Sequence, residues 1–155
     1  MRIANESDAE GLVRLINAAF IVEKVAFDGD RIDLAGVREL LNKGTFLVTE
    51  GGESSELGGC VYLELSGDRC YLGLLSVATA LQGQGLARRL SMAAEEFARK
   101  AGCHAMDLRI ISPRVESLLP IYLRLGYVEA GTKPLPADKV VKVPCHYVLM
   151  TKSLV

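Results

Sequence analysis

The sequence predicts a single α/β domain with a mixed, mostly antiparallel sheet. Three observations support this prediction. The chain has 155 residues, which is the length of one domain. Helical and strand-like patterns alternate along it, and a glycine-rich junction, LQGQG, joins an apolar strand pattern to an amphipathic helical one. We expect about four helices and one pair of parallel strands that are connected through the helix after this junction.

Two helices are expected at the start of the chain. Ser7 and Glu10 match a capping box, and the apolar residues after them follow helical spacing, which predicts a helix over residues 8–19. A second helix is predicted over residues 34–42, with Asp33 as its N-cap and Gly44 as a left-handed stop. The segment between them, IVEKVAFDGDRI, is mixed and irregular.

Three strands should follow these helices. Apolar runs predict strands over residues 45–50, 59–65 and 70–79. The segments between the strands, GGESSE and SGDR, have turn compositions. Because such connections are short, we expect an antiparallel meander.

The clearest helix begins after the glycine-rich junction. Apolar residues repeat every three or four positions over residues 86–101, and Gly102 should close this helix. The run at 105–112 predicts another strand. It most simply lies parallel to strand 70–79, because a right-handed helical crossover joins the two.

The last third of the chain should hold one more helix and two strands. Ser112 and Pro113 form an N-cap and first-turn pair for a helix that ends at Gly126 and contains Pro120. Strands are predicted over residues 127–131 and 146–152, joined by TKPLPADKVVKVP. The complete order of elements is two helices, three strands, helix, strand, helix and two strands.

Composition and charge limit the classes of partner. The chain is 50% hydrophobic and 24% charged, without an apolar run that predicts a membrane span. It carries 18 basic and 19 acidic side chains, a formal charge of -1, which gives no support for a nucleic-acid partner or an anionic membrane surface. The polar start, MRIANESDAE, does not resemble a secretory signal. We therefore expect a cytoplasmic protein.

The cysteines do not indicate a metal site. Cys60, Cys70, Cys103 and Cys145 are scattered without CxxC spacing, and three of them lie in apolar runs. This pattern is typical of reduced core thiols. We expect no metal.

The glycine-rich junction is a candidate anion site. The first turn of a helix has unpaired backbone N–H groups and a partial positive charge. Gly83 and Gly85 would leave the amides of residues 83–87 open to a phosphate, and Gln82 could add a side-chain donor. A plain strand-to-helix turn would use the same glycines, so this pattern alone leaves both interpretations open.

Two well-known phosphate loops do not fit this junction. A dinucleotide-binding fingerprint needs a third glycine at the position of Arg88. A P-loop needs Lys and Ser/Thr after the glycine, whereas Leu86 and Ala87 follow here.

Two motifs resemble the GNAT superfamily of N-acetyltransferases. The pattern Gln82-x-x-Gly85-x-Ala87 is similar to the family's coenzyme A loop, and PIYLRLGYVEAG is similar to a later family segment in which a helical tyrosine precedes Leu-Gly-Phe/Tyr. The motifs occur in the family's order, about 40 residues apart, and the resemblance spans nearly the whole chain. It implies a single N-acetyltransferase domain over residues 1–155, with a GNAT-like fold in which the two parallel strands splay apart.

The resemblance also implies how acetyl-CoA is bound. The pyrophosphate should rest on main-chain amides at the start of the helix, and the pantetheine arm should pair with main chain at the gap between the parted strands. Arg88 would assist the phosphates, with a solvated charge on the helix surface as its alternative role. The main-chain N–H of Val77 or a neighbour would polarise the thioester carbonyl. The implied cofactor-binding residues are Leu75, Ser76, Val77, Gln82, Gly83, Gln84, Gly85, Leu86, Ala87, Arg88 and Tyr122.

Tyr122 is the implied catalytic acid. In the family a tyrosine at this place points at the coenzyme sulfur, and a phenol of pKa about 10 can protonate a thiolate whose free pKa is about 8.5. Tyr122 also belongs to an apolar helical stripe, so packing is its alternative role. Val115 departs from the asparagine that many relatives carry seven residues before this tyrosine, and valine cannot make the same hydrogen bond to the coenzyme.

The base that accepts the amine proton is less clear. Family members often place a glutamate on the strand before the loop, but the corresponding residue here is Tyr71. Glu64 and Glu23 are the available carboxylates, each with surface charge as its alternative role.

The sequence thus indicates an acetyl-CoA-dependent transfer of an acetyl group to a primary amine of a small molecule or peptide, by direct attack in a ternary complex. The alternative is a non-catalytic acyl-CoA sensor or partner switch. Residues 20–32 and 132–144 should flank the acceptor, and acidic residues in the first of these segments would favour a cationic amine. Relatives are often dimers, and the final strands would be available to pair in a homodimer.

Overall fold

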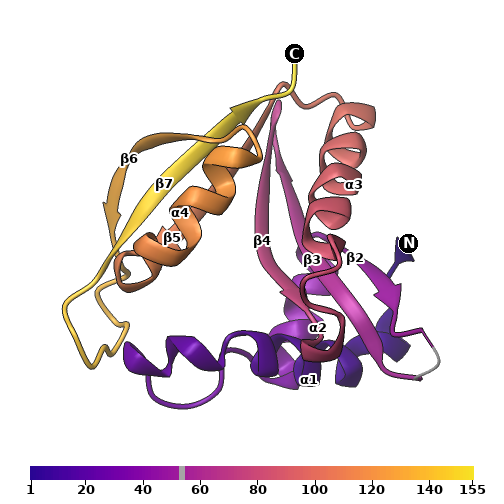
Figure 1. The fold of residues 1–155 in the computed structure, drawn as a ribbon, viewed down its shortest axis with the longest axis horizontal. Coiled ribbons are helices and arrows are strands. Elements are labelled where there is room, and N and C mark those ends of the chain that lie inside the picture. The colour runs from indigo at the N-terminus through magenta and orange to yellow at the C-terminus, as the bar shows by residue number, and fades with distance from the viewer. Residues whose placement is uncertain (53–54) are drawn as a thin grey trace.

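One mixed sheet organises the structure, with its strands in the order β1-β2-β3-β4-β5-β7-β6 (Figure 1). This computed structural model describes residues 1–52 and 55–155. Neighbouring strands are antiparallel except for β4 and β5, which run parallel, so the predicted sheet is confirmed. The strands are β1 (Arg2–Ile3), β2 (Thr45–Glu50), β3 (Leu57–Ser66), β4 (Arg69–Val77), β5 (Ala105–Ile111), β6 (Val128–Pro134) and β7 (His146–Ser153).

Four α-helices cover the sheet within the described residues, in agreement with the sequence. They are α1 (Ala9–Ala19), α2 (Leu34–Lys43), α3 (Leu86–Lys100) and α4 (Val115–Arg124). The described residues also form four short 3-10 helices: η1 (Glu6–Asp8), η2 (Ile21–Val25), η3 (Thr79–Leu81) and η4 (Ser112–Arg114). The meander of β2, β3 and β4 and the crossover through α3 to β5 are both as predicted.

Among the residues that the structure describes, the core consists of two apolar clusters on opposite faces of the sheet. Burial of this apolar surface is the main favourable term in folding. One cluster joins α3 to the central strands and includes Leu90 and Met106, both fully buried; α4 packs against it with partly buried side chains. The other joins α1 and α2 to β2 and β3 and includes Leu12 and Phe46, which are also fully buried.

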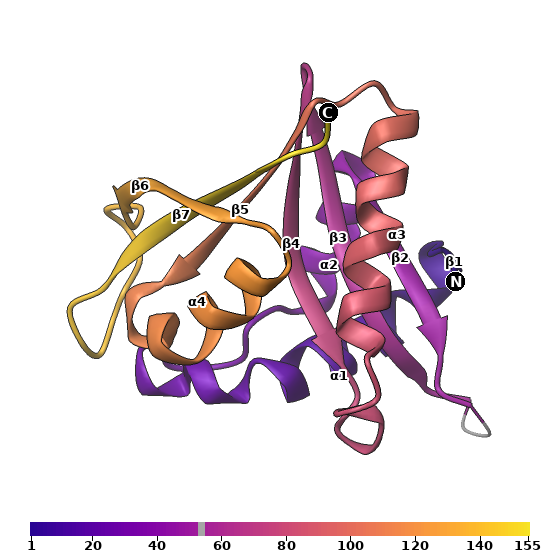
Figure 2. The same cartoon turned by 45° about the horizontal axis from the view of Figure 1, so that its top comes forward.

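Strands β4 and β5 form a V (Figure 2). They pair only at one end, where Arg69, Cys70 and Tyr71 lie opposite residues 105–107. Beyond Tyr71 the strands part, which leaves the later backbone of β4 without a neighbouring strand on that side in the described part of the chain. The predicted gap between these strands is confirmed.

A β-bulge in β4 lies just beyond the point of parting. Cys60 pairs with Ser76 and Tyr62 pairs with Gly73, so Val61 faces two residues of β4. Leu74 in the bulge has a φ of 52°, which is unusual for a residue with a side chain. Bulges bend the strand that carries them, and this bend turns the end of β4 away from β5.

A polar cluster closes the narrow end of the V. The guanidinium of Arg69 donates to both carboxylate oxygens of Asp107, at 2.7 and 2.6 Å, and to the hydroxyl of Thr151 at 3.0 Å. These hydrogen bonds join β4, β5 and β7. They also hold the pKa of Asp107 below its ordinary value, with the Arg69 hydrogen bond as the largest cause.

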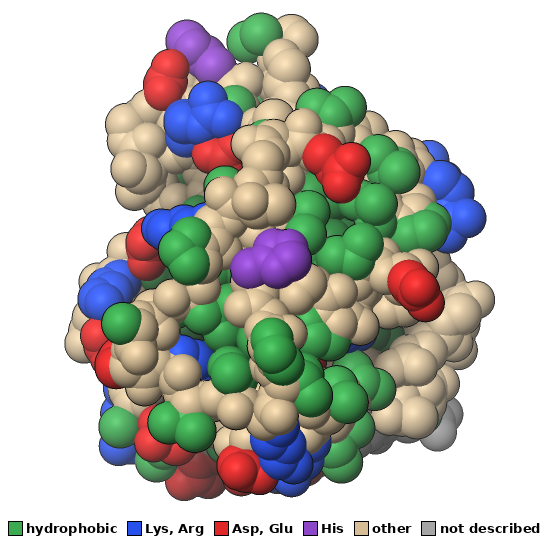
Figure 3. Space-filling view, turned by 90° about the vertical axis from the view of Figure 1, so that its left-hand side faces the viewer, with side chains coloured by type: hydrophobic (Ala, Val, Ile, Leu, Met, Phe, Trp, Pro, Cys, Tyr) green, Lys and Arg blue, Asp and Glu red, His purple; other side chains and the backbone are tan. Residues whose placement is uncertain are grey.

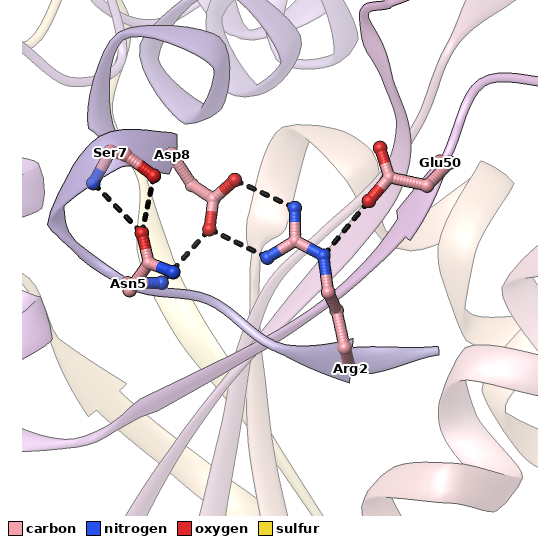
Figure 4. A network of polar contacts seen from close by, with 5 residues as sticks. All are labelled: Arg2, Asn5, Ser7, Asp8 and Glu50. Atoms are coloured by element: carbon pink, nitrogen blue, oxygen red, sulfur yellow. Dashed lines mark hydrogen bonds and ion pairs between the residues drawn. The ribbon is translucent and has the colours of Figure 1, made fainter.

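The predicted capping box at Ser7 and Glu10 is wrong. The box lies two residues earlier: Asn5 accepts from the amide and hydroxyl of Ser7, and Asp8 accepts from the amide of Asn5 (Figure 4). Asp8 is held in place by Arg2, which also reaches Glu50 on β2. Because Asp8 is the better-anchored acceptor, the chain turns through η1 before α1 begins.

The left-handed stop predicted at Gly44 is also wrong. Gly44 is extended, with φ -152° and ψ -153°. A side chain does not fit at Gly44, because a Cβ there would lie 2.4 Å from the carbonyl oxygen of Leu63. The glycine thus permits close contact between the end of α2 and β3, whereas Gly102 does adopt the expected left-handed conformation after α3.

Ser112 does not act as the predicted N-cap. The segment 112–114 forms η4, and the Ser112 hydroxyl accepts a hydrogen bond from the amide of His146 on β7 instead. The tertiary partner therefore replaces the local one. The helix itself is present, contains Pro120 and is followed by Gly126 at a φ of 95°.

Three predictions concern smaller features. The GGESSE turn includes residues 53 and 54, which lie outside the described residues. Cys60, Cys70 and Cys103 are buried free thiols, as expected, and Cys145 is half-buried. No helix among the described residues has the length and apolar character needed to cross a lipid bilayer.

Candidate active site

A cavity of about 470 Å³ occupies the open end of the V. Its walls come from β4, β5 and α4, from η2 and the loop after it, and from the connection between β6 and β7. This volume lies in the range of small-molecule sites, which is about 300–1,000 Å³. The cavity therefore lies at the carboxyl ends of the two parallel strands, where ligands of α/β sheets commonly bind.

The start of α3 opens at this cavity. Gly85 is the N-cap with a φ of 77°, no side chain of the described residues caps the helix, and Gly83 has a φ of 79°. A Cβ at either glycine would meet no atom within 4 Å. The first-turn amides of the helix are thus open to an anion on a positively polarised end.

The other residues of the predicted cofactor loop surround this start. Gln82 and Ala87 line the cavity, and the Gln82 side chain donates to the carbonyl of Val77 at 3.4 Å. Leu86 is buried in the core, so it can offer only its main chain. Gln84 and Arg88 are exposed beside the loop.

The unpaired part of β4 forms one wall of the cavity. Leu75 and Val77 line it. Ser76 is 1% exposed, and its hydroxyl donates to the carbonyl of Leu74 at 2.9 Å, so its side chain is engaged within the strand. What β4 offers to a ligand here is main-chain N–H and C=O groups.

Tyr122 lies on α4 with its side chain both in the cavity wall and against the core. Its ring packs edge-to-face on Tyr127, with centroids 5.8 Å apart. Burial raises the pKa of Tyr122 to about 12, although the nearby Arg114 guanidinium lowers it. The phenol is therefore protonated across the physiological range, as a proton donor must be.

Glu23 comes from η2 and faces the same cavity. It is 9% exposed, and it accepts a hydrogen bond from Arg114 at 3.3 Å while Arg31 lies 4.0 Å away. Both arginines also lie over the ring of Phe20. One carboxylate thus stands between two guanidinium groups.

Glu64 lies elsewhere. It is not part of the cavity wall and accepts a hydrogen bond from the hydroxyl of Tyr62 at 2.6 Å. Burial and this hydrogen bond raise the pKa of Tyr62. The structure therefore brings together Tyr122, Glu23 and the loop, and leaves Glu64 apart from them.

Sequence reasoning missed a group of aromatic and basic side chains on the β5 side of the cavity. Arg109 lies between the rings of Tyr71 and Tyr147, with its central carbon 5.1 and 4.5 Å from their centroids. All three residues line the cavity. The signal was present in the run MDLRII, because a charge within an alternating apolar strand marks the face that is not packed in the core.

These features correspond to a known family. Residues 12–127 match the acetyltransferase (GNAT) family, so the chain belongs to the GNAT family of acetyltransferases. The curated acetyltransferase Atu2258 of Agrobacterium fabrum is 39% identical over 62 residues, which are 40% of this chain and 43% of that protein. The matched segment thus spans less than half of that relative's length.

Solved structures show the same fold. The ribosomal-protein-alanine N-acetyltransferase of Brucella melitensis superposes with a TM-score of 0.74 at 22% identity, over 98% of each chain. The protein yncA of Salmonella typhimurium, solved with its cofactor acetyl-CoA, superposes with a TM-score of 0.71 at 23% identity, over 99% of this chain and 92% of that one. The GNAT-like fold expected from the sequence is therefore confirmed.

Proposed function

We propose that the protein transfers the acetyl group of acetyl-CoA to a primary amine of a small molecule or peptide, by direct attack in a ternary complex. One observation carries the proposal: the uncapped start of α3 and the unpaired edge of β4 open onto the same cavity. The whole chain, residues 1–155, would form this catalytic domain. A homodimer is compatible with the outer edge of β6, all of whose residues are exposed.

The cofactor loop fits a diphosphate. Gly83 and Gly85 leave open space where side chains would stand, so phosphate oxygens can approach the amides of residues 83–87. Arg88 is exposed beside them and adds a positive charge. Beyond the loop, the parted main chain of Leu75 to Val77 can pair with the amides of pantetheine much as with an added strand.

Acetyl-CoA would supply the thioester, whose C–S bond breaks as the amine nitrogen bonds to the acetyl carbon. The main-chain N–H of Val77 would stabilise negative charge on the carbonyl oxygen. Tyr122 would donate its phenolic proton to the departing sulfur, and its raised pKa keeps that proton available. The amine must release one proton to a base or to solvent.

Of the two candidate bases, Glu23 is the one in the cavity wall. Its carboxylate could hold the incoming ammonium group or accept a proton from it. Glu64 would need an intervening path to the cavity, since it lies outside the wall. The geometry therefore favours Glu23.

A binding measurement with a matched control tests the cofactor loop. Calorimetry with acetyl-CoA should show binding that Gly85→Asp weakens at least about tenfold, because the variant places a carboxylate where the phosphates would lie. Gly102→Asp is the control: it has a similar left-handed φ of 87° and equally open space at the far end of α3. Equal affinity of the two variants would contradict the loop assignment.

Thiol release distinguishes an enzyme from an acyl-CoA sensor. Free CoA should appear with time when acetyl-CoA and a panel of primary amines are added. Normal acetyl-CoA binding without CoA release for any amine would support the sensor instead.

A further inference from the structure

The cavity carries more positive charge than its own carboxylates neutralise. Its basic residues are Lys24, Arg31, Arg109, Arg114 and Lys139, and its acidic residues are Glu23, Asp28, Asp30 and Asp138. Arg31 and Arg114 share the single carboxylate of Glu23. Asp28 is paired with a lysine outside the wall.

Arg109 is the most prominent of the unneutralised charges. Within residues 1–52 and 55–155 it forms no ion pair with a carboxylate, and its neighbours on both sides are the rings of Tyr71 and Tyr147. A guanidinium that lies over aromatic rings is held by its faces, while its N–H donors lie in its plane. Arg109 is therefore held in position with donors available for a planar anion.

The position of Arg109 points toward the acceptor. Its strand, β5, has parted from β4 at this level, since the last paired residues are Tyr71 and Asp107. The wall near Tyr147 continues into the β6–β7 connection, which contacts η2 and the loop after it: Lys142 donates to the carbonyls of Ala26 and Lys24, and Lys139 lies over the ring of Phe27. The start of α3, where the diphosphate of the cofactor is proposed to bind, belongs to another part of the cavity.

Tyr71 is held in place by the strand itself. A Cβ at Gly73 would lie 2.8 Å from the Tyr71 ring and 3.1 Å from its hydroxyl, so the ring covers this glycine. Burial raises the pKa of Tyr71, and the Arg109 guanidinium opposes that shift. The aromatic side of the arginine site is thus fixed by packing before any ligand arrives.

We propose that Arg109 receives a carboxylate on the acceptor, so that the acceptor is a small amine that also carries an acid group, such as a free amino acid. The inference rests on the proposed acetyl transfer and names the substrate class for that site. Arg109 would bind the carboxylate through two parallel N–H donors. Glu23 lies on η2 in the wall of the same cavity, where it can take the ammonium end of the same molecule.

The reaction on such an acceptor is balanced. The amine nitrogen bonds to the acetyl carbon and loses one proton, the C–S bond breaks, and the sulfur gains one proton to give free CoA. The carboxylate takes no part in bond changes. Arg109 is therefore a specificity-determining residue.

The test compares amino acids with their own carboxamides. Leucine, methionine and phenylalanine should be acetylated with kcat/KM values about 10- to 100-fold higher than leucinamide, methioninamide and phenylalaninamide, the range expected from one charge-assisted hydrogen-bonded pair. Arg109→Met should remove that preference, so that each amino acid and its carboxamide have similar kcat/KM values. Arg109→Lys, which keeps the charge without the planar pair of donors, should retain part of the preference.

A matched control removes the same charge elsewhere. Arg124→Met changes an exposed arginine at the end of α4 that is not in the cavity wall, and the preference should persist. Equal kcat/KM values for acids and amides in the wild type would overturn the proposal, as would a preference that survives Arg109→Met.

Two further arms separate other outcomes. With a neutral amine, a preference for succinyl-CoA over acetyl-CoA that Arg109→Met abolishes would place the carboxylate on the acyl group, and would overturn an acidic acceptor. Calorimetry of the same amino acids on CoA-loaded protein needs no turnover: binding that is lost in Arg109→Met supports the carboxylate site even if acetyl transfer fails, and binding that is unchanged contradicts it. Acetyl transfer that shows no Arg109-dependent preference for acids over amides would leave the proposed function standing and the carboxylate site refuted.

Discussion

Arg69 and Arg109 lie at the two ends of the same V, and their surroundings differ. At the closed end, Arg69 donates three hydrogen bonds to Asp107 and Thr151, so its charge is used within the protein. At the open end, Arg109 lies between two tyrosine rings without a carboxylate partner among the described residues. The comparison indicates that the closed end serves stability, whereas the open end keeps backbone and charge free for ligands.

The largest effect should come from the open end. Tyr122→Phe removes the proposed proton donor and should lower kcat about 100-fold, the lower part of the range for general acid catalysis, with acetyl-CoA affinity nearly unchanged. Because the pKa of Tyr122 is raised to about 12, the wild-type rate should show no loss below about pH 10 that depends on this residue. Thiol release between pH 6 and 10 measures both effects.

Tyr127→Phe is the control for that experiment. Tyr127 contacts the ring of Tyr122, but its own hydroxyl is buried without a hydrogen-bond partner in the described part of the chain. Its removal should leave kcat within about twofold of wild type, since no partner is lost. A full rate in Tyr122→Phe, with chemistry limiting, would eliminate the proton-donor role.

The next effect concerns packing at the two ends. Met106 is fully buried opposite Cys70 at the closed end, and Met106→Ala should lower the free energy of unfolding by about 2–5 kcal/mol. Ile121 is 41% exposed in the cavity wall, so Ile121→Ala should cost less than about 1 kcal/mol. Urea unfolding measures the two values. Similar decreases in the free energy of unfolding would refute the conclusion that the closed end contributes more to stability than the open end.

The smallest effect concerns the ion pair at the closed end. Asp107→Asn should lower the free energy of unfolding by about 1 kcal/mol at pH 7, since both partners are partly exposed. The folded protein holds the pKa of Asp107 below its unfolded value of about 3.9, so this contribution is complete above about pH 5 and is lost as the pH falls through the folded pKa.

The matching variant at the open end is Asp30→Asn. Asp30 is 69% exposed and lies 3.7 Å from Lys24, so its replacement should change stability by a few tenths of a kcal/mol at most. Denaturation curves at pH 3 and pH 7 should separate the two variants. A difference between Asp107→Asn and wild type that is as large at pH 3 as at pH 7 would contradict the ionic explanation.

Much of the fold followed from the sequence because periodicity and turn composition are local. The helix at 86–101, the meander and the glycine-rich junction were predictable for that reason. The errors occurred where a tertiary contact replaced a local one: Arg2 moved the cap to Asp8, His146 took the hydroxyl of Ser112, and Gly44 is needed for contact with β3.

The site was less accessible to sequence reasoning. The loop motif was enough to predict the candidate cofactor residues. Glu23 and Glu64, in contrast, could not be compared as candidate bases without knowing which one faces the cavity. The left-handed φ of Leu74 has no sequence signal, because leucine is not a residue that favours this conformation. The pairing of Arg109 with Tyr71 and Tyr147 joins three strands and therefore depends on topology.

The separation of the two apolar clusters has a consequence for how such a protein can diverge. Phe20 and Ile32, which flank η2 and the loop after it, rest on the cluster beneath α1 and α2, whereas Tyr122 and the start of α3 rest on the other cluster. Hydrophobic substitutions that repack one side need not disturb the other, because the sheet stands between them. Figure 3 shows the outer side of the molecule, which is the left-hand side of Figure 1. Here β6 and its connection to β7 carry the exposed residues Val128, Val140 and Val141, so substitutions are even less constrained by core packing. During evolution, the acceptor side of the proposed site could therefore change repeatedly while the proposed coenzyme-binding side is retained.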